Sequence, residues 1–420
     1  MTPQPSTIIR TYLTLVLFNT LAASLIWGIN TLFLLDAGLS IVEAFAANAF
    51  FTAGMVLFEI PTGVIADSKG RRLSYLLGTV TLAVTTFLYL ILAWMHAPFL
   101  YWAIVSVFLG LGFTFFSGAT DAWLVDALKA TKYKGTLEAV FGKAQIVGGV
   151  AMLGGAIAGG VIAQFTSLEV PYLVRVGLLV ITFIIAAVYM KDIGFSPEKA
   201  ARYTTAIVSI VKQSVKYGFG KPAVRWVILA APFISGVMVY VFYALQPYLL
   251  ELFGDSKAYW IAGLASAIVA GAQIVGGFLV PYVRRAFKRR TEVLLVGTAI
   301  SSVLLIVLAI VANFYFVILI IVLWGLIAAA VTPVRQAYLN DLIPSKQRAT
   351  VLSFDSLLGS SGGVVSQPLL GKAADMYGYA TSYMIAGFVQ LLALPFLFMA
   401  NRLKESADVK QTEGERLKES

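Results

Sequence analysis

The sequence contains no cysteine and a single histidine, His96, among its 420 residues. Disulfides, thiolate metal sites, iron–sulfur clusters and cysteine nucleophiles are therefore excluded, and so is a metal site built from several histidines. The string Gly-x-x-x-x-Gly-Lys-Ser/Thr does not occur either, so the chain has no P-loop of its own for ATP. We expect neither a metal nor an organic cofactor.

Charged residues are also scarce. They make up 12% of the chain, whereas hydrophobic residues make up 59%. A soluble globular domain usually has about 25% charged residues, and no soluble core is large enough to hide this surplus of apolar surface. The composition excludes a water-soluble enzyme and indicates an all-α integral membrane protein. A membrane-embedded enzyme is the least favoured class, because no nucleophile–base pair or metal cluster is apparent.

Twelve apolar segments are each long enough to cross a bilayer core of about 30 Å. The first continues past residue 30, which is too long for the apolar region of a cleavable signal peptide. The predicted spans are 11–35, 41–66, 73–94, 99–127, 137–165, 171–190, 225–251, 258–280, 292–311, 315–340, 349–371 and 380–401.

Positive charge is concentrated on one side of these spans. If the N-terminus is cytoplasmic, 26 of the 31 Lys and Arg residues lie in the segments that face the cytoplasm. This distribution predicts that both termini lie in the cytoplasm. It also explains the net charge of +10 as a topology signal. The expected partner of these basic residues is therefore the lipid bilayer and not nucleic acid. Residues 197–219 combine an apolar face with several Lys and Arg residues, which predicts a helix along the membrane surface or else a disordered linker.

The two halves of the chain repeat weakly at a shift of about 214–215 residues. The segment 121–126 matches 336–341, and Gly63 recurs as Gly277. Two parallel six-helix repeats are typical of transporters that rock two bundles around a central site. We therefore predict twelve transmembrane helices in two pseudo-symmetric bundles. The predicted divisions are an N-terminal bundle (1–190), a cytoplasmic linker (191–224), a C-terminal bundle (225–401) and a cytoplasmic tail (402–420).

The turn between the second and third spans carries a specific motif. Gly63 is followed by Asp67, Gly70, Arg71 and Arg72. Gly63 can let its helix pack closely on a neighbour, and Gly70 can adopt the positive φ of a tight turn. Asp67 can accept hydrogen bonds at a helix N-terminus or pair with an arginine.

This motif resembles the signature loop of the major facilitator superfamily and occupies the same place between spans. Ser68 departs from the family pattern, and Lys69 stands as the substitute charge. The resemblance implies a twelve-helix transporter in which the loop latches the two halves in the outward-facing state. It also implies that Asp67 caps a helix of the second half and that Arg71 or Arg72 pairs with Asp126. The counterpart loop has Pro281 in place of the aspartate, so the latch there is weaker or absent.

Residues 142–160 are similar to the glycine-rich motif of the family's drug/proton antiporters. Ala151 replaces a glycine and Ala156 replaces the kinking proline, so a plain packing face of small residues is an equal interpretation. The arginine that the antiporters often have in the fourth span is Ser106 here.

Ionisable residues at membrane depth are candidates for function. The fourth and fifth spans form one hairpin, and the tenth and eleventh form another. Counted from the centre of each hairpin, Asp121 lies at the same membrane depth as Lys143, and Arg335 at the same depth as Asp355. We predict these two ion pairs, facing the bundle interior or the cavity. Purely structural pairing is an equal interpretation.

Glu59 lies about two helical turns from Asp67, toward the midplane. Its repeat counterpart is Gln273, and the sequence offers no cation to pair with it. A carboxylate buried without a partner takes up a proton readily, so Glu59 is the first proton-coupling candidate and Asp121 the second. The alternative is a neutral Glu59 hydrogen-bonded to a neighbouring helix.

Polar and aromatic residues on the expected cavity helices indicate a large, mostly apolar pocket. These cavity candidates are Asn19, Trp27, Asn30, Phe113, Phe116, Tyr240, Tyr243 and Gln246. Such a pocket suits an amphipathic or lipophilic small-molecule substrate better than a sugar, which needs many hydrogen bonds.

We therefore predict a secondary active transporter that works by alternating access and exports amphipathic compounds, driven by a proton or other ion gradient. We expect a functional monomer in the plasma membrane, and the compact loops favour a bacterial inner membrane. A permease for a small nutrient or metabolite is the nearest alternative. A membrane sensor or channel on the same fold is less favoured.

Overall fold

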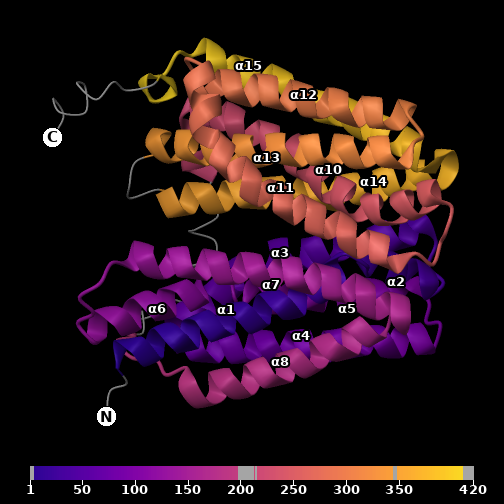
Figure 1. Cartoon of the computed structure of the whole chain (residues 1–420). Coiled ribbons are helices and arrows are strands. Elements are labelled where there is room, and N and C mark those ends of the chain that lie inside the picture. Colours follow the sequence, from indigo (N-terminus) through magenta and orange to yellow (C-terminus); the bar gives the residue numbers. More distant parts are fainter. Residues whose placement is uncertain (1–3, 197–211, 213–214, 344–347, 410–420) are drawn as a thin grey trace. The chain divides into compact units, whose positions relative to one another are not determined.

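The computed structural model describes residues 4–196, 212, 215–343 and 348–409 (Figure 1). These residues form long helices and no β-sheet, which confirms the predicted fold class. The first-half helices are α1 (Pro5–Trp27), α2 (Asn30–Asp36), α3 (Ile41–Lys69), α4 (Arg71–Trp94), α5 (Phe99–Thr114), α6 (Ala119–Ala130), α7 (Leu137–Phe165) and α8 (Val170–Tyr189). The later helices are α10 (Pro222–Phe253), α11 (Tyr259–Ala286), α12 (Arg290–Ile310), α13 (Phe314–Leu342), α14 (Arg348–Leu391), α15 (Leu394–Arg402) and the 3-10 turn η2 (Ser406–Asp408).

Eleven segments of the described residues are long and apolar enough to cross a membrane. The last of them, Val351–Arg402, is 52 residues long. At about 1.5 Å per residue it is far too long for one crossing. Non-helical backbone at Gly378 (φ 81°, ψ 162°) interrupts it between the two predicted spans 349–371 and 380–401. This segment therefore supplies both the eleventh and the twelfth predicted spans.

Two predicted spans are interrupted. The first divides at Gly28 and Ile29 into α1 and α2, and the fourth divides at 115–118 into α5 and α6. Gly118 has φ +66°, a conformation that favours glycine. The sequence analysis predicted continuous helices here, because apolar composition does not distinguish a continuous span from an interrupted one.

The chain divides into two compact units. The first comprises Met1–Val208 with Phe242–Ala270, and the second comprises Ser209–Val241 with Gly271–Ser420. The tip of the α10–α11 hairpin thus belongs with the first six spans, so these units do not coincide with the predicted divisions at 190 and 225.

In the first unit, α1 packs on α7 and α8, α3 packs on α5, and α4 packs on α8 (Figure 1). Gly155 and Gly159 of α7 make the close contact with α1 possible, because a Cβ on either residue would overlap Ser24 or Leu25. The interpretation of 142–160 as a small-residue packing face accounts for these glycines. In the second unit, α12 packs on α13, α14 and α15.

Large apolar side chains remain exposed along many helices of both units. Phe108, Ile184 and Leu319 are 49%, 54% and 52% exposed, respectively. Such surfaces suit contact with lipid rather than water. Most of the helix predicted over 197–219 and of the predicted tail lies outside the described residues.

Candidate functional site: two interrupted spans and a buried arginine

The interruption of the first span is stabilised by one side chain of α10. The Nε2 of Gln246 donates to the carbonyl oxygen of Trp27 (2.6 Å), and the backbone N–H of Thr31 donates to Oε1 of Gln246 (3.0 Å). Gln246 is 1% exposed. Backbone groups freed inside a membrane need such partners, and interrupted helices of this kind form binding sites in transporters.

A chain of polar side chains continues from this interruption. Tyr172 Oη donates to Oδ1 of Asn30 (2.9 Å), and Nδ2 of Asn30 donates to Oδ1 of Asn48 (2.8 Å). All three residues are buried. The Nδ2 of Asn48 is also buried and has no hydrogen-bond partner among the described residues, so the chain ends on a donor without an acceptor.

Arg175 lies on α8, three residues after Tyr172, and is 1% exposed. Its guanidinium carbon lies 5.8 Å from the ring centre of Phe113. Its electrostatic neighbours are Tyr172, Tyr243 and Tyr89. Among the described residues, Arg175 forms no ion pair, and its Nε has no hydrogen-bond partner. The first unit therefore contains a buried positive charge without a counterion.

Four buried aromatic residues pack together, and two of them, Tyr172 and Tyr89, are electrostatic neighbours of Arg175. The ring of Phe33 stacks on that of Tyr172 with centroids 4.1 Å apart, and Tyr89 meets Trp102 edge to face at 5.0 Å. Phe33 also contacts Tyr89 and Trp102. The hydroxyl of Tyr89 is hydrogen-bonded to Oγ of Ser106 (2.6 Å), so this residue is part of the packed core.

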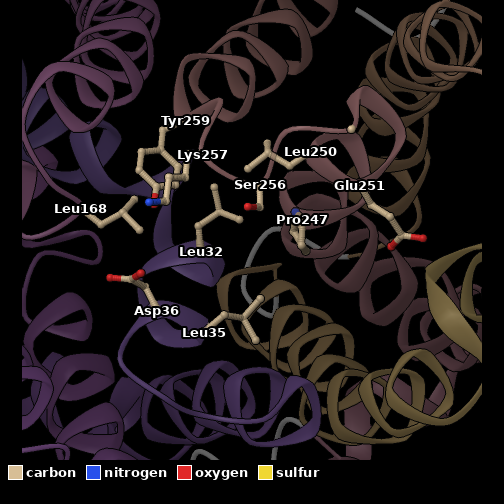
Figure 2. A pocket seen from close by; sticks show the side chains of 11 residues that line it. Leu32, Leu35, Asp36, Leu168, Pro247, Leu250, Glu251, Ser256, Lys257 and Tyr259 are labelled. Atoms are coloured by element: carbon tan, nitrogen blue, oxygen red, sulfur yellow. The ribbon is translucent and has the colours of Figure 1, made fainter.

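A pocket of about 660 Å³ opens on another face of α2 (Figure 2). Most of its lining is apolar. Charge comes from Asp36, Glu251 and Lys257, and Figure 2 shows Asp36 and Lys257 on one side with Glu251 on the other. Asp36 is exposed at the rim. What burial it has, together with the negative charge of Glu169, raises the pKa of Asp36, and Lys257 opposes this shift.

The interruption of the fourth span exposes Ser117 next to α3. Its Oγ donates to Oε1 of Glu59 at 2.5 Å. Glu59 is therefore partly buried and hydrogen-bonded to a residue of the turn between α5 and α6, which is closer to the alternative of a hydrogen-bonded Glu59 than to a carboxylate without a partner. The sequence analysis missed this contact because a continuous helix does not turn Ser117 out in this way.

The predicted ion pair of Asp121 with Lys143 is absent. Oδ1 of Asp121 instead accepts a hydrogen bond from Tyr12 Oη (2.7 Å), and both Asp121 and Lys143 are exposed. Asp121 and Lys143 lie on unbroken helices to either side of the connecting turn, so the residue count gives their depth but not the direction of each side chain.

Arg335 and Asp355 do lie together, in the second unit. Nη1 and Nη2 of Arg335 donate to the two carboxylate oxygens of Asp355 at 2.7 and 2.6 Å. The two side chains are 18% and 13% exposed. Arg335 also donates to the carbonyl oxygen of Val227 (3.3 Å), so the pair joins α10, α13 and α14.

In the motif after the second span, one expected contact forms and another does not. Asp67 pairs with Arg71, and the Nη2 of Arg72 donates to the carbonyl oxygen of Ala187 (2.6 Å). The predicted pairing of either arginine with Asp126 is therefore not present among the described residues. Gly70 does adopt a positive φ, of +114°.

Gly63 does not serve the close packing expected of it. A Cβ built there would meet no described atom within 4 Å. Its part in the motif is therefore not explained by contact with a neighbouring helix.

Two aspartates that were not predicted from the sequence cap the third transmembrane span of each half. Oδ1 of Asp192 accepts from the backbone N–H of Arg72 (2.9 Å) at the start of α4. Asp408 accepts from the N–H and the hydroxyl of Thr291 (2.8 and 2.6 Å) at the start of α12. Each aspartate follows the last helix of its half, so the repeat itself was the signal that could have revealed them.

A related ion pair occurs in the second half, where the latch was predicted to be weak. The Nη1 of Arg290 lies 2.6 Å from Oδ2 of Asp341. Asp341 is the repeat counterpart of Asp126, so the expected arginine–aspartate contact is present in the second unit and not in the first.

Five of the eight cavity candidates lie around the first interruption. Trp27 and Gln246 contribute at the interruption itself, Asn30 belongs to the polar chain, and Phe113 and Tyr243 lie beside Arg175.

Three other cavity candidates lie elsewhere. Phe116 packs edge to face on Tyr75 with centroids 4.7 Å apart. Tyr240 is hydrogen-bonded to Ser382 (2.5 Å) in the second unit. Asn19 is half-buried on α1. Arg175 itself was missed, although a lone arginine in the apolar span 171–190 was visible in the sequence.

The family model of the Major Facilitator Superfamily matches residues 12–287 and 262–419. Because these matches cover nearly the whole chain, the protein belongs to this superfamily of membrane transporters. The resemblance drawn from the motif at 63–72 is thereby confirmed.

Individual relatives agree with this assignment. The chain is 21% identical over 402 residues to the uncharacterised MFS-type transporter YxaM of Bacillus subtilis (strain 168), covering 92% of this chain and 94% of YxaM. It is similar in structure to the nucleoside transporter NupG, with a TM-score of 0.76, 12% identity, and coverage of 95% and 100%. It is also similar to a D-xylose–proton symporter, with a TM-score of 0.62, 18% identity, and coverage of 94% and 97%. At these identities the solved structures show the fold alone.

Proposed function

We propose that this transporter exports amphipathic or lipophilic small molecules in exchange for protons. The observation that carries the proposal is the interrupted first span, whose few polar groups lie among aromatic side chains. Such a site offers apolar contact with a small number of orienting hydrogen bonds. Alternating access requires that substrate and proton bind the inward-open and outward-open states with different affinities.

Proton coupling is assigned to Glu59 first and to Asp121 second. Both carboxylates accept hydrogen bonds from hydroxyl groups, of Ser117 and Tyr12, and neither has an ion pair among the described residues. A carboxylate without a cation beside it loses less electrostatic stabilisation when it is protonated. Asp355, in contrast, is held by Arg335 and is less suited to carry a proton.

The motif at 63–72 acts in this proposal as a latch that stabilises the outward-facing state. The transporter works as a monomer in the cytoplasmic membrane of a bacterium, with both termini in the cytoplasm. The ion gradient supplies the energy, and no cofactor is needed.

The second candidate is a permease for a small nutrient or metabolite. The polar chain of Asn30, Asn48 and Tyr172 favours it, because it could hold a more polar solute. The names of NupG and of the D-xylose–proton symporter concern such solutes. This candidate predicts saturable uptake and no protection from lipophilic toxins. A sensor or channel would signal or carry current without stoichiometric movement of solute.

Purified protein in proteoliposomes tests the proposal. Efflux of amphipathic fluorescent dyes, one cationic and one anionic, is measured with and without an imposed proton gradient. We expect gradient-driven efflux that Glu59→Gln abolishes while dye binding survives, and a partial loss in Asp121→Asn. Wild-type protein that moves none of the dyes in response to the gradient would contradict the exporter, and saturable uptake of nucleosides or sugars would then favour the permease.

A further inference from the structure

We propose that Arg175 binds the acidic group of the transported molecule, so that the substrates are amphipathic organic acids. This inference rests on the proposed transport function and specifies its substrate class. The juxtaposition that carries it is a buried guanidinium without a counterion, next to a polar chain that ends on a free amide donor.

The first step is the charge itself. Arg175 is 1% exposed, and no carboxylate of the described residues pairs with it. A buried charge without a partner is strongly unfavourable, and ionisable residues at membrane depth mark substrate or ion pathways. The ring of Phe113 eases part of this cost but brings no negative charge. An anionic group on the substrate would remove this cost of burying an unpaired charge.

The second step is the balance of hydrogen-bonding groups. Two donors here are buried and have no partner among the described residues, namely Nε of Arg175 and Nδ2 of Asn48. Tyr172, three residues before Arg175 on α8, belongs to the polar chain that ends at Asn48. Both unmet groups are donors. The missing component is therefore an acceptor, and a carboxylate has two oxygens in the geometry that a guanidinium binds best.

The third step is the body of the molecule. Phe113 and Tyr243 are half-buried, whereas Arg175, whose guanidinium lies over the ring of Phe113, is fully buried. Their rings suit an aromatic or apolar group attached to the acid. A lipophilic cation, in contrast, would meet the uncompensated charge of Arg175 and be repelled.

A matched pair of ligands tests this inference without any transport. Binding of 1-naphthoate and of 1-naphthamide, which differ in the acid group, is measured by calorimetry on the detergent-solubilised full chain. We expect naphthoate to bind on the order of 10- to 100-fold more tightly, as a charged hydrogen-bonded pair does. Arg175→Gln should reduce the preference to less than about twofold, and Arg175→Lys should keep part of it. Arg225→Gln is the control, because Arg225 also lies against an aromatic ring (Trp226, 5.0 Å) but belongs to the second unit.

The outcomes separate this inference from the proposed function. Equal binding of the two ligands by the wild type, binding of neither, or an unchanged preference in Arg175→Gln would each overturn the role of Arg175. The wild-type comparison decides the matter even if Arg175→Gln does not fold. Gradient-driven export of a cationic dye together with equal binding of the two ligands would refute the inference and leave the exporter intact. Preferential binding of naphthoate without any gradient-driven movement would support the role of Arg175 and contradict the exporter.

Discussion

At the scale of single residues, carboxylates within the predicted spans have different partners in the two units. Glu59 and Asp121 of the first unit accept from hydroxyl groups, whereas Asp355 of the second is held by both Nη atoms of Arg335. In the proposed function, Glu59 and Asp121 are the proton carriers and the Arg335–Asp355 pair has a structural role.

Asp355→Asn should destabilise the protein by on the order of 3 kcal/mol, because it leaves Arg335 partly buried without its counterion. Asp341→Asn is the matched control. It breaks the Arg290–Asp341 pair, whose carboxylate is 54% exposed, and should cost less than about 1 kcal/mol. Thermal unfolding in detergent measures both. Equal losses of stability would show that burial does not set the strength of these pairs.

Residue counting predicted the Arg335–Asp355 contact and failed for Asp121 and Lys143. The helix carrying Arg335 is continuous from Phe314 to Leu342, so depth can be counted along it. Asp121 and Lys143 also lie on unbroken helices, but equal depth does not fix the face on which a side chain lies, and Asp121 contacts Tyr12 instead. Arg175 escaped notice for another reason. The sequence predictions considered oppositely charged pairs and unpaired carboxylates at membrane depth, whereas Arg175 is an unpaired cation.

At the scale of the elements, the two interruptions lie at the two candidate sites. The first adjoins the polar chain that leads to Arg175, and the second turns Ser117 toward Glu59. Composition predicted the spans, but the interruptions depend on tertiary contacts. Gln246 stabilises the first of them from a helix more than two hundred residues away in sequence, so no local pattern around Gly28 reveals it.

Gln246→Leu should lower the unfolding temperature by several degrees, because it leaves Trp27 C=O and Thr31 N–H without partners. Each orphaned group costs about 1–3 kcal/mol. Gln164→Leu is the control, since Gln164 also accepts a backbone N–H, from Trp260, but over 3.4 Å and only half-buried. An unfolding temperature that falls no further in Gln246→Leu than in Gln164→Leu would mean that the interruption does not depend on this amide.

The segment after α15 belongs to the folded second unit through Asp408. A chain that ends after Val409 keeps this cap on α12 and should unfold like the full chain. A chain that ends after Lys404 loses both hydrogen bonds to Thr291 and should be less stable by about 2 kcal/mol. Asp408→Ala in the full chain should reproduce most of that loss. Identical melting curves for the two truncated chains would rule out a structural role for the cap.

At the scale of the whole molecule, the sequence was sufficient for the spans, the repeat and the family. The motif at 63–72 and the twelve apolar segments led to the major facilitator superfamily, which the family match confirms. The repeat also has a structural counterpart that was not predicted, in the aspartates 192 and 408 that cap equivalent helices. The substrate was not predictable, because it depends on how single side chains from five helices meet around the first interruption.

Proton movement driven by the solute is the direct test of the proposed exchange of solute for protons. Proteoliposomes contain a pH-sensitive dye, and an outwardly directed gradient of 1-naphthoate is imposed with the membrane potential clamped and no initial pH difference. Protein-free liposomes correct for passive diffusion of the acid. Wild-type protein should acidify the lumen more than the protein-free control does. Glu59→Gln should abolish this acidification. Saturable movement of naphthoate by the wild type without any matching pH change would contradict proton exchange.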